Sequence, residues 1–236
     1  LNEKFIIERK GTNGDKKKAM RLFNELDGQY DAFGIGGIDL YIYSAGKRYT
    51  FRDARKMVKN ITETPAVDGS GLKNTLEREV LYYLERELNF SFNNKKVLMV
   101  SAVDRFGMAE TFNEMGAEIL FGDLIFGLGI PLAIRSVSQL EFLARLIAPI
   151  ITKLPFELIY PTGEKQDSLE SKSKYDRYYN EVDIIAGDFH FIRRYMPDDL
   201  SGKIIITNTV TENDVCELKK RNVEKLITTT PELRGR

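Results

Sequence analysis

The sequence predicts an α/β protein in which a smaller N-terminal α/β domain precedes a Rossmann-like, doubly wound parallel sheet. Short apolar runs alternate with amphipathic segments through the C-terminal two thirds of the chain, as in a parallel sheet with helices on both faces. Several of these runs are continuously apolar, which is typical of strands buried on both faces. A segment with helical apolar spacing separates them from the first part of the chain.

Residues 1–71 are predicted to form the smaller, incomplete domain. Strands are expected at 4–9, 31–37, 39–44 and 64–68, and a helix at 14–28 that ends at Gly28. Residues 72–92 are then expected to form one linking helix, with the ligand in the cleft between the two domains. Its apolar positions, which span about four to five turns, are Leu72, Leu76, Val80, Tyr83, Leu84 and Leu88.

Residues 93–236 are predicted to form the Rossmann-like domain. Its six expected strands are 96–102, 117–123, 156–161, 182–188, 202–209 and 224–231. Its helices are expected at 107–115, at 136–153, within 168–181, at 189–196 and at 211–221. Thr211 can cap the last helix with Asp214 three residues on. The charged stretch 163–181 reads as a solvated helix, with a mobile loop near the ligand as the alternative.

Composition limits the partners that the protein can have. Lys plus Arg and Asp plus Glu both total 35, so the net charge offers no attraction to nucleic acid or to an anionic membrane. No stretch has the roughly 18 consecutive apolar residues of a membrane helix. We therefore expect a cytoplasmic protein with a small-molecule substrate, leave homo-oligomer formation open, and expect further residues beyond both ends.

The single cysteine and the single histidine both read as structural residues. One cysteine, Cys216, excludes an internal disulfide framework, suits a reducing compartment and is expected to pack within a helix. One histidine, His190, lies between two phenylalanines and is expected to be packed, and no second histidine exists for a metal site. Arg193 and Arg194 read as a solvated helix face, with an anion clamp as the alternative. No metal site is predicted.

Ligands of an open parallel sheet bind beyond the carboxyl ends of its strands, and small polar residues follow every expected strand. Strands that end in turns explain part of this pattern. The clusters "TNT" (207–209) and "TTTP" (228–231) exceed what turns need. Thr207, Asn208 and Thr228 are therefore candidate contacts for a cofactor or a phosphate.

The turn after the first strand of the sheet resembles a dinucleotide loop with altered chemistry. The pattern G-x-G-x-x-G places Ala102, Asp104 and Gly107 at the glycine positions, so only the third glycine is kept. Because the second position faces the pyrophosphate, Asp104 would repel it unless Arg105 and the helix-start amides outweigh the carboxylate. The candidate cofactor contacts in this stretch are Ser101, Asp104, Arg105, Phe106 and Gly107.

Asp123 ends the next strand, 22 residues after Ser101. That is the spacing expected of the carboxylate that binds a ribose 2′-hydroxyl, and it favours NAD over NADP. The alternative is an ordinary turn residue.

A second candidate for ligand binding is "VDGSGLKNTLE", residues 67–77. Free amides at 69–71 and Lys73 near the helix start could hold an anion. Asp68 either caps this turn or takes part in proton transfer.

The order "DGSGLKNTLEREV", long helix, "KKVLMVSAVDRFGMAETFNEMGAEI" resembles the shikimate and quinate dehydrogenase family over roughly 60 residues. The resemblance implies that Asp68 matches the family's catalytic aspartate and that residues 104–107 match its cofactor loop. It also implies that Asp123 fits the NAD-preferring, quinate-like members. The family's N-V-T-x-P-x-K segment, with its catalytic lysine, has no counterpart in "NITETPAVDGSG".

The leading hypothesis is an NAD(P)-dependent oxidoreductase for a small hydroxy acid of the quinate or shikimate type, with NAD as cofactor. Asp68 would orient or deprotonate the hydroxyl group, with Lys73 close by. One alternative is a non-catalytic Rossmann-like protein that binds a nucleotide or a phosphorylated small molecule. The other is a transferase that holds phosphate at its threonine turns.

Overall fold

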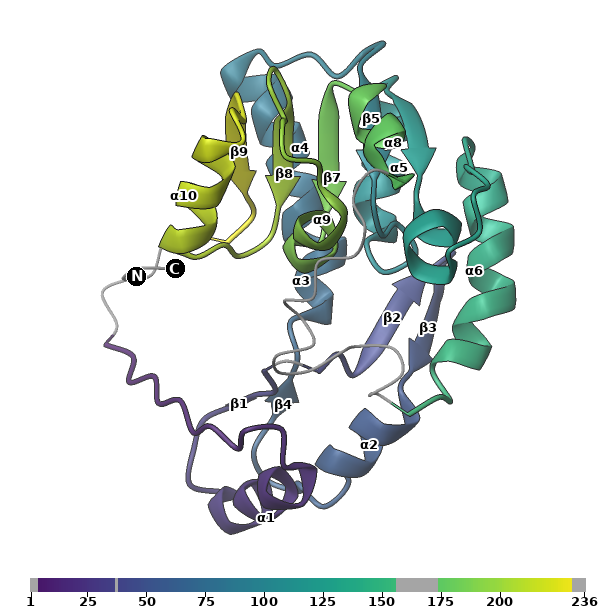
Figure 1. Ribbon diagram of the computed structural model, residues 1–236. Coiled ribbons are helices and arrows are strands. Elements are labelled where there is room, and N and C mark those ends of the chain that lie inside the picture. Colours follow the sequence, from purple (N-terminus) through teal and green to yellow (C-terminus); the bar gives the residue numbers. More distant parts are fainter. Residues whose placement is uncertain (1–3, 37, 156–173, 231–236) are drawn as a thin grey trace.

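The computed structural model describes residues 4–36, 38–155 and 174–230, and its largest element is a five-stranded parallel sheet (Figure 1). The strand order is β6-β5-β7-β8-β9. The strands are β5 (Lys96–Met99), β6 (Glu118–Phe121), β7 (Ile184–Gly187), β8 (Ile204–Thr207) and β9 (Lys225–Thr228). The expected strand 156–161 lies outside the described residues. β6 lies on one side of β5, and β7 lies on the other. The strand order therefore reverses between β5 and β7. Ligands of open parallel sheets bind at such a switch point, beyond the carboxyl ends of the strands.

Both faces of the sheet are covered, which confirms the Rossmann-like α/β class. Alternate strand residues face opposite cores: Val97 and Met99 belong to one cluster, and Leu98 belongs to the other. The first core includes side chains of α4 (Leu76–Leu88), α5 (Phe106–Glu114) and α6 (Val137–Ile151). The second core includes side chains of the π-helical turn η1 (Asp123–Gly127), α8 (Asp176–Asn180), α9 (Phe189–Tyr195) and α10 (Glu212–Lys220).

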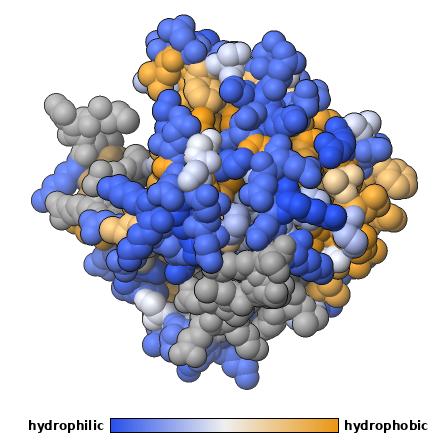
Figure 2. Space-filling model, turned by 45° about the horizontal axis from the view of Figure 1, so that its top comes forward, coloured by the Kyte–Doolittle hydropathy of each residue, from blue (hydrophilic) through white to orange (hydrophobic). Residues whose placement is uncertain are grey.

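Most of the expected helices of this region form close to their expected bounds. The Thr211 side chain accepts a hydrogen bond from the Asp214 amide, and the Asp214 carboxylate accepts one from the Thr211 amide, so the cap of α10 is confirmed. Within 168–181, the described residues form only the short helix α8. The outer side of α6 exposes three large apolar side chains, Phe142, Leu146 and Ile150. Figure 2 shows an apolar patch at its right-hand edge, on the side where Figure 1 places α6.

The N-terminal part of the chain differs from its prediction. No strand forms at residues 4–9, where Phe5, Ile6 and Ile7 are exposed and pair with no other strand among the described residues. Two elements that were not predicted from the sequence are present, the strand β3 (Lys47–Thr50) and the helix α2 (Arg52–Val58). The remaining elements are α1 (Lys16–Leu26), β1 (Phe33–Gly34), which pairs with β4 (Ala66–Val67), and β2 (Tyr41–Ser44).

The strands β2 and β3 form an antiparallel hairpin that packs against the helices of the large sheet. Its tight turn uses Ala45 and Gly46, both at positive φ, as in the type I′ turns that join many two-residue hairpins. Ile42 and Phe51 are buried in a small core that also contacts Ile151 at the end of α6. The Arg52 amide donates to the Thr152 carbonyl at 2.9 Å. The hairpin therefore connects the N-terminal residues to the sheet region, whereas α1, β1 and β4 lie apart from the sheet (Figure 1).

The expected single helix over 72–92 is interrupted. A short helix α3 (Ser70–Asn74) precedes α4, and Thr75 between them has φ −118° and ψ −74°. Of the predicted apolar positions, Leu72, Tyr83 and Leu88 are more than half exposed, whereas Leu84 is buried. The buried face of α4 therefore matches the predicted stripe only in part, and it also includes Leu81.

Candidate functional site

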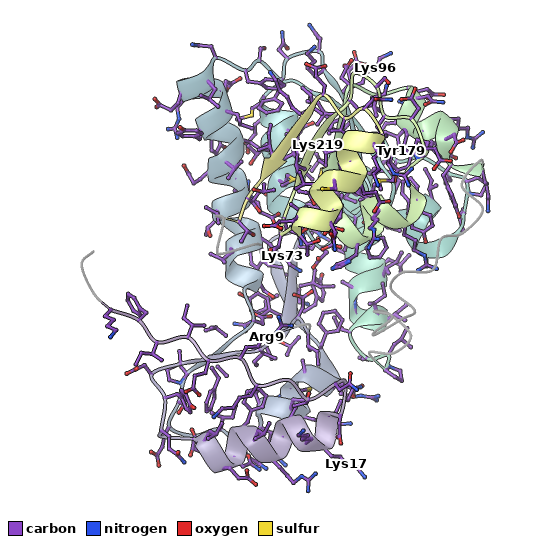
Figure 3. The ribbon with its side chains drawn as sticks, turned by 60° about the vertical axis from the view of Figure 1, so that its left-hand side comes forward. Arg9, Lys17, Lys73, Lys96, Tyr179 and Lys219 are labelled. Carbon is purple, nitrogen blue, oxygen red and sulfur yellow. The ribbon has the colours of Figure 1, made fainter. Side chains whose placement is uncertain are left out.

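A buried charge cluster lies at the carboxyl end of β5, where α3 and the loop before β2 meet the β5–α5 loop. Lys73 of α3 points between the hairpin and the large sheet (Figure 3), and its Nζ lies 2.7 Å from Asp104 Oδ2 and 2.9 Å from Asp39 Oδ2. All three side chains are at least four-fifths buried. We call these residues the Lys73 cluster.

The Lys73 cluster contains a carboxyl group that changes its protonation near neutral pH. Burial raises the pKa of Asp104, Lys73 opposes this increase and Asp39 adds to it, and the result is a pKa of about 6. Burial lowers the pKa of Lys73, but the Asp104 and Asp39 carboxylates outweigh that effect and the net pKa is raised. The ammonium is therefore kept charged next to a carboxyl group with a shifted pKa, which is a combination suited to acid–base chemistry.

A small cavity opens beside this cluster, with a volume of about 10 Å³, which is room for one water molecule. Its lining residues are Tyr41, Tyr43, Ser70, Lys73, Asn74, Asp104, Phe106 and Gly107. Among the described residues, the buried Asp104 Oδ1 has no hydrogen-bond partner. A ligand hydroxyl group at this cavity could supply one.

Asp68 holds the turn that starts α3. Its carboxylate accepts hydrogen bonds from the Leu40 amide and from the Ser70 amide, the latter at 3.0 Å, and also contacts the Ser70 hydroxyl. These contacts fix the segment before β2 against the start of α3 and thereby position Lys73. The Lys73 ammonium bonds to Asp39 and Asp104 rather than to Asp68, so the two predicted catalytic residues share a neighbourhood without a direct bond.

Arg105 points into the protein interior, and its contact with a cofactor stays a prediction. Its side chain is 2% exposed, and its guanidinium pairs with Glu77 of α4 and, at 3.2 Å, with Asp188 at the start of α9. Burial raises the pKa of Asp188, but Arg105 and His190 outweigh burial and the pKa is lowered. Asp188 also accepts a hydrogen bond from Asn208 Nδ2 at 2.9 Å. This buried network ties α4, the β5–α5 loop and the ends of β7 and β8 together.

Glu77 and Asp39 were not predicted from the sequence. Glu77 is the one acidic residue on the α4 face that also carries Leu81 and Leu84, and a charge at such a position signals a buried partner. Asp39 had no comparable signal, because its pairing with Lys73 joins residues far apart in sequence.

Asp123 satisfies two backbone amides of the β5–α5 loop. Its carboxylate accepts hydrogen bonds from the amides of Ala102 and Val103, each at 2.9 Å. Burial raises the pKa of Asp123 to about 6, although these two amides lower it. The carboxylate thus satisfies the β5–α5 loop internally, and binding of a ribose by Asp123 remains a prediction.

The other residues of the altered glycine pattern serve packing. Phe106 is 3% exposed and belongs to the core. A side chain on Gly107 would meet Asn74 and Arg78 at 2.8 Å, so the retained glycine permits α5 to approach α3 and α4. Ser101 Oγ is buried and, within the described part of the chain, has no hydrogen-bond partner.

The threonine turns use their polar groups internally. Thr207 Oγ1 donates to the Gly187 carbonyl at 2.8 Å, and Thr228 Oγ1 donates to the Thr230 carbonyl at 3.2 Å. Asn208 Oδ1 accepts from the Phe189 amide at 3.1 Å. The Thr207 contact joins the ends of β7 and β8, whereas the Thr228 contact is local to the end of β9, so these polar groups have partners within the protein.

His190 and Cys216 are both exposed, so the packed positions predicted for them are wrong. Arg193 pairs with Glu217 at 2.9 Å, which agrees with a helix face. The described residues contain no group of three or more His, Cys, Asp or Glu side chains able to hold a metal ion. None of the described helices has the length and apolar character needed to cross a bilayer.

The fold and the site define an α/β protein with a Rossmann-like parallel sheet and a buried acid–base cluster at its switch point. The chain belongs to the family described as domain of unknown function DUF8754, whose model matches residues 71–236. Residues 1–68 match a second model, domain of unknown function DUF8753. No curated protein and no solved structure matches the chain.

Proposed function

We propose that this protein binds a small hydroxy acid at the Lys73 cluster and exchanges a proton with its hydroxyl group. The observation that carries the proposal is the position of Lys73 Nζ, within 2.9 Å of Asp39 and Asp104 beside the cavity. Asp104, with a pKa of about 6, can change its protonation at physiological pH.

Each member of the cluster has a distinct role in this proposal. Lys73 donates a hydrogen bond to the ligand oxygen and stabilises negative charge that develops there. Asp104, in its carboxylate form above pH 6, accepts the hydroxyl proton. Asp39 keeps Lys73 charged while Asp104 is protonated, because it is the second carboxylate beside the ammonium.

The reaction suggested by the family resemblance is NAD(P)-linked oxidation of a quinate-like or shikimate-like hydroxy acid, with NAD as cofactor. The β5–α5 loop does not fit the pyrophosphate in the arrangement described. Asp104 replaces the second glycine and Asp123 occupies two loop amides. We therefore assign no step of the reaction to a dinucleotide held by this loop.

The second candidate function is a Rossmann-like binding protein without hydride chemistry. The contact of Asp123 with the Ala102 and Val103 amides favours it, since a loop satisfied by its own chain has no need of a phosphate. A transferase with phosphate at the threonine turns gains no such support, because those hydroxyl groups bond to backbone carbonyls.

Calorimetric titration with NAD, NADH, NADP and NADPH tests the cofactor. If Asp123 binds ribose, the wild-type protein binds NAD and Asp123→Ala weakens it. If Asp123 blocks the loop, Asp123→Ala binds a dinucleotide more tightly than the wild type. If neither the wild type nor Asp123→Ala binds any of the four dinucleotides, the dehydrogenase hypothesis is excluded and the binding protein without hydride chemistry is left.

Turnover tests the Lys73 cluster directly. Oxidation of quinate and shikimate with each bound dinucleotide should fall by roughly 100-fold or more in Lys73→Met, the usual size of the loss of a donor that stabilises developing negative charge. The exposed residue Lys219 of α10 provides the matched control, Lys219→Met, which should retain full activity. Equal activity in the two folded variants would contradict the proposed role of Lys73.

A further inference from the structure

One face of the β2–β3 hairpin joins the cavity beside the Lys73 cluster. Tyr41 and Tyr43 both line that cavity and, two residues apart in β2, point to the same side of the hairpin. On β3, Arg48 is paired directly with Tyr43 and therefore shares this side. The Arg48 guanidinium carbon lies 3.6 Å from the centre of the Tyr41 ring. Arg48 thus lies opposite Tyr43 and over Tyr41, next to the residues that line the cavity.

The stacked guanidinium retains its donors. Among the described residues, Arg48 forms no ion pair and no hydrogen bond through its side chain, which remains exposed. Stacking on an aromatic ring fixes the guanidinium plane and leaves the in-plane N–H groups available. That geometry matches a carboxylate, which accepts two parallel hydrogen bonds from the arginine fork.

A carboxylate ligand at this site needs a cation outside the Lys73 cluster. With Asp104 ionised, the Lys73 cluster holds two carboxylates and one ammonium, and so it repels an anionic ligand. Arg105 cannot compensate, because Glu77 and Asp188 neutralise it in the interior. Lys47 cannot either, since it lies over the Tyr49 ring on the other face of the hairpin.

We propose that Arg48 is the carboxylate-binding residue of this site, and that the ligand is a small molecule with a carboxylate and a hydroxyl group. The carboxylate binds the Arg48 fork against the Tyr41 ring, and the hydroxyl group reaches the Lys73 cluster. The inference rests on the proposed function for the hydroxyl contact, whereas the contact with Arg48 can be measured by binding alone.

The test is calorimetric binding of quinate and shikimate, and of their uncharged methyl esters, to the full chain. Arg48→Gln should weaken binding of the acids by roughly ten-fold or more, as expected for a charge-assisted bidentate contact, and should leave the esters unchanged. Arg48→Lys should lose part of the affinity, because an ammonium cannot form the fork. The control Lys47→Gln, from the opposite face of the same hairpin, should bind both forms as the wild type does.

Three outcomes separate this inference from the proposed reaction. Binding of the acids that depends on Arg48 supports the inference even if no dinucleotide-linked turnover occurs, and absent turnover then counts only against the oxidoreductase. An equal loss of affinity for the acids in Arg48→Gln and Lys47→Gln would overturn the inference, since general surface charge would then account for the binding. Failure of the wild-type protein to bind either acid would also overturn it.

Discussion

Asp104 lies in the β5–α5 loop, and Asp123, which follows β6, contacts two amides of that loop. A dinucleotide-binding protein carries a glycine at the first of these positions and a ribose-binding carboxylate at the second. Burial raises the pKa of each to about 6, but the two residues are compensated differently. Asp104 pairs with an ammonium, whereas Asp123 accepts hydrogen bonds from two amides. The pairing of Asp104 with Lys73 suits proton exchange with a ligand, whereas Asp123 satisfies backbone amides of the loop within the protein.

Stability should depend on pH through Asp123. Because its pKa in the folded protein, about 6, lies above its ordinary value of 3.8, the folded state binds the proton more tightly than the unfolded state. Its contribution to the free energy of unfolding is therefore greatest below pH 4 and is lost as the pH rises through 6. Asp123→Asn removes this loss, because its amide oxygen can still accept from Ala102 and Val103.

We expect Asp123→Asn to exceed the wild type in free energy of unfolding by roughly 1–3 kcal/mol at pH 7.5 and to match it near pH 4. Urea unfolding at pH 4, 6 and 7.5 measures the difference. The exposed residue Asp31 supplies the control, Asp31→Asn, which should follow the wild type at each pH. A difference between Asp123→Asn and wild type that is the same at every pH would refute the role of Asp123 burial.

At the scale of single elements, local sequence signals predicted α10 and its cap. The role of Gly107, in contrast, depends on contacts between elements. The glycine lies at the start of α5, where the sequence made it a candidate cofactor contact. The close neighbours are instead Asn74 of α3 and Arg78 of α4, each of which would lie 2.8 Å from a Cβ atom added to Gly107. A glycine-pattern match can therefore arise from helix packing.

Gly107→Ala should destabilise the protein by about 1–3 kcal/mol, because the added methyl group forces α5 away from α3 and α4. Gly127→Ala is the control, since this exposed helical glycine has no neighbour within 4 Å of the added carbon. It should change the stability by less than about 0.5 kcal/mol. Denaturant unfolding measures both. A fully stable Gly107→Ala would show that Arg78 and Asn74 move aside freely, and would contradict the packing role of this glycine.

At the scale of the whole molecule, the hairpin and α2 connect the N-terminal residues to the sheet region. Phe51 is 1% exposed, and Ile42 and Phe51 pack toward Ile151 of α6. The two family models meet between residues 68 and 71, so this contact crosses the family boundary. Arg48 and Lys73 also lie on opposite sides of that boundary, and the proposed ligand site needs both.

Removal of residues 1–70 should therefore destabilise the rest of the chain. The fragment 71–236 exposes the apolar surface at Ile151 and should have a lower melting temperature and stronger binding of a hydrophobic dye than the full chain. The fragment 38–236, which keeps the hairpin and α2, is the control and should behave more like the full chain. Equal melting temperatures for 71–236 and the full chain would show that the hairpin contributes little.

The parallel sheet and most of its helices could be predicted from the sequence, because continuous apolar runs, helical spacing and the Thr211 cap are local patterns. The candidate site was predicted in part. The sequence indicated Lys73 and Asp104 as site residues in two separate motifs, and the structure places Lys73 Nζ 2.7 Å from Asp104 Oδ2. The break at Thr75, the strand β3 and the position of Asp39 could not be predicted, since each depends on packing between distant segments.

The sequence by itself determined which segments could be strands of a sheet buried on both faces and which polar residues would follow them. Only the tertiary structure decided which partner each polar residue received. Arg105 turned inward to Glu77, Asp123 satisfied the loop amides, and Lys73 met Asp39 and Asp104. The physical reason is that a buried charge is stable only beside a compensating group, and the fold, which brings residues distant in sequence together, selects that group.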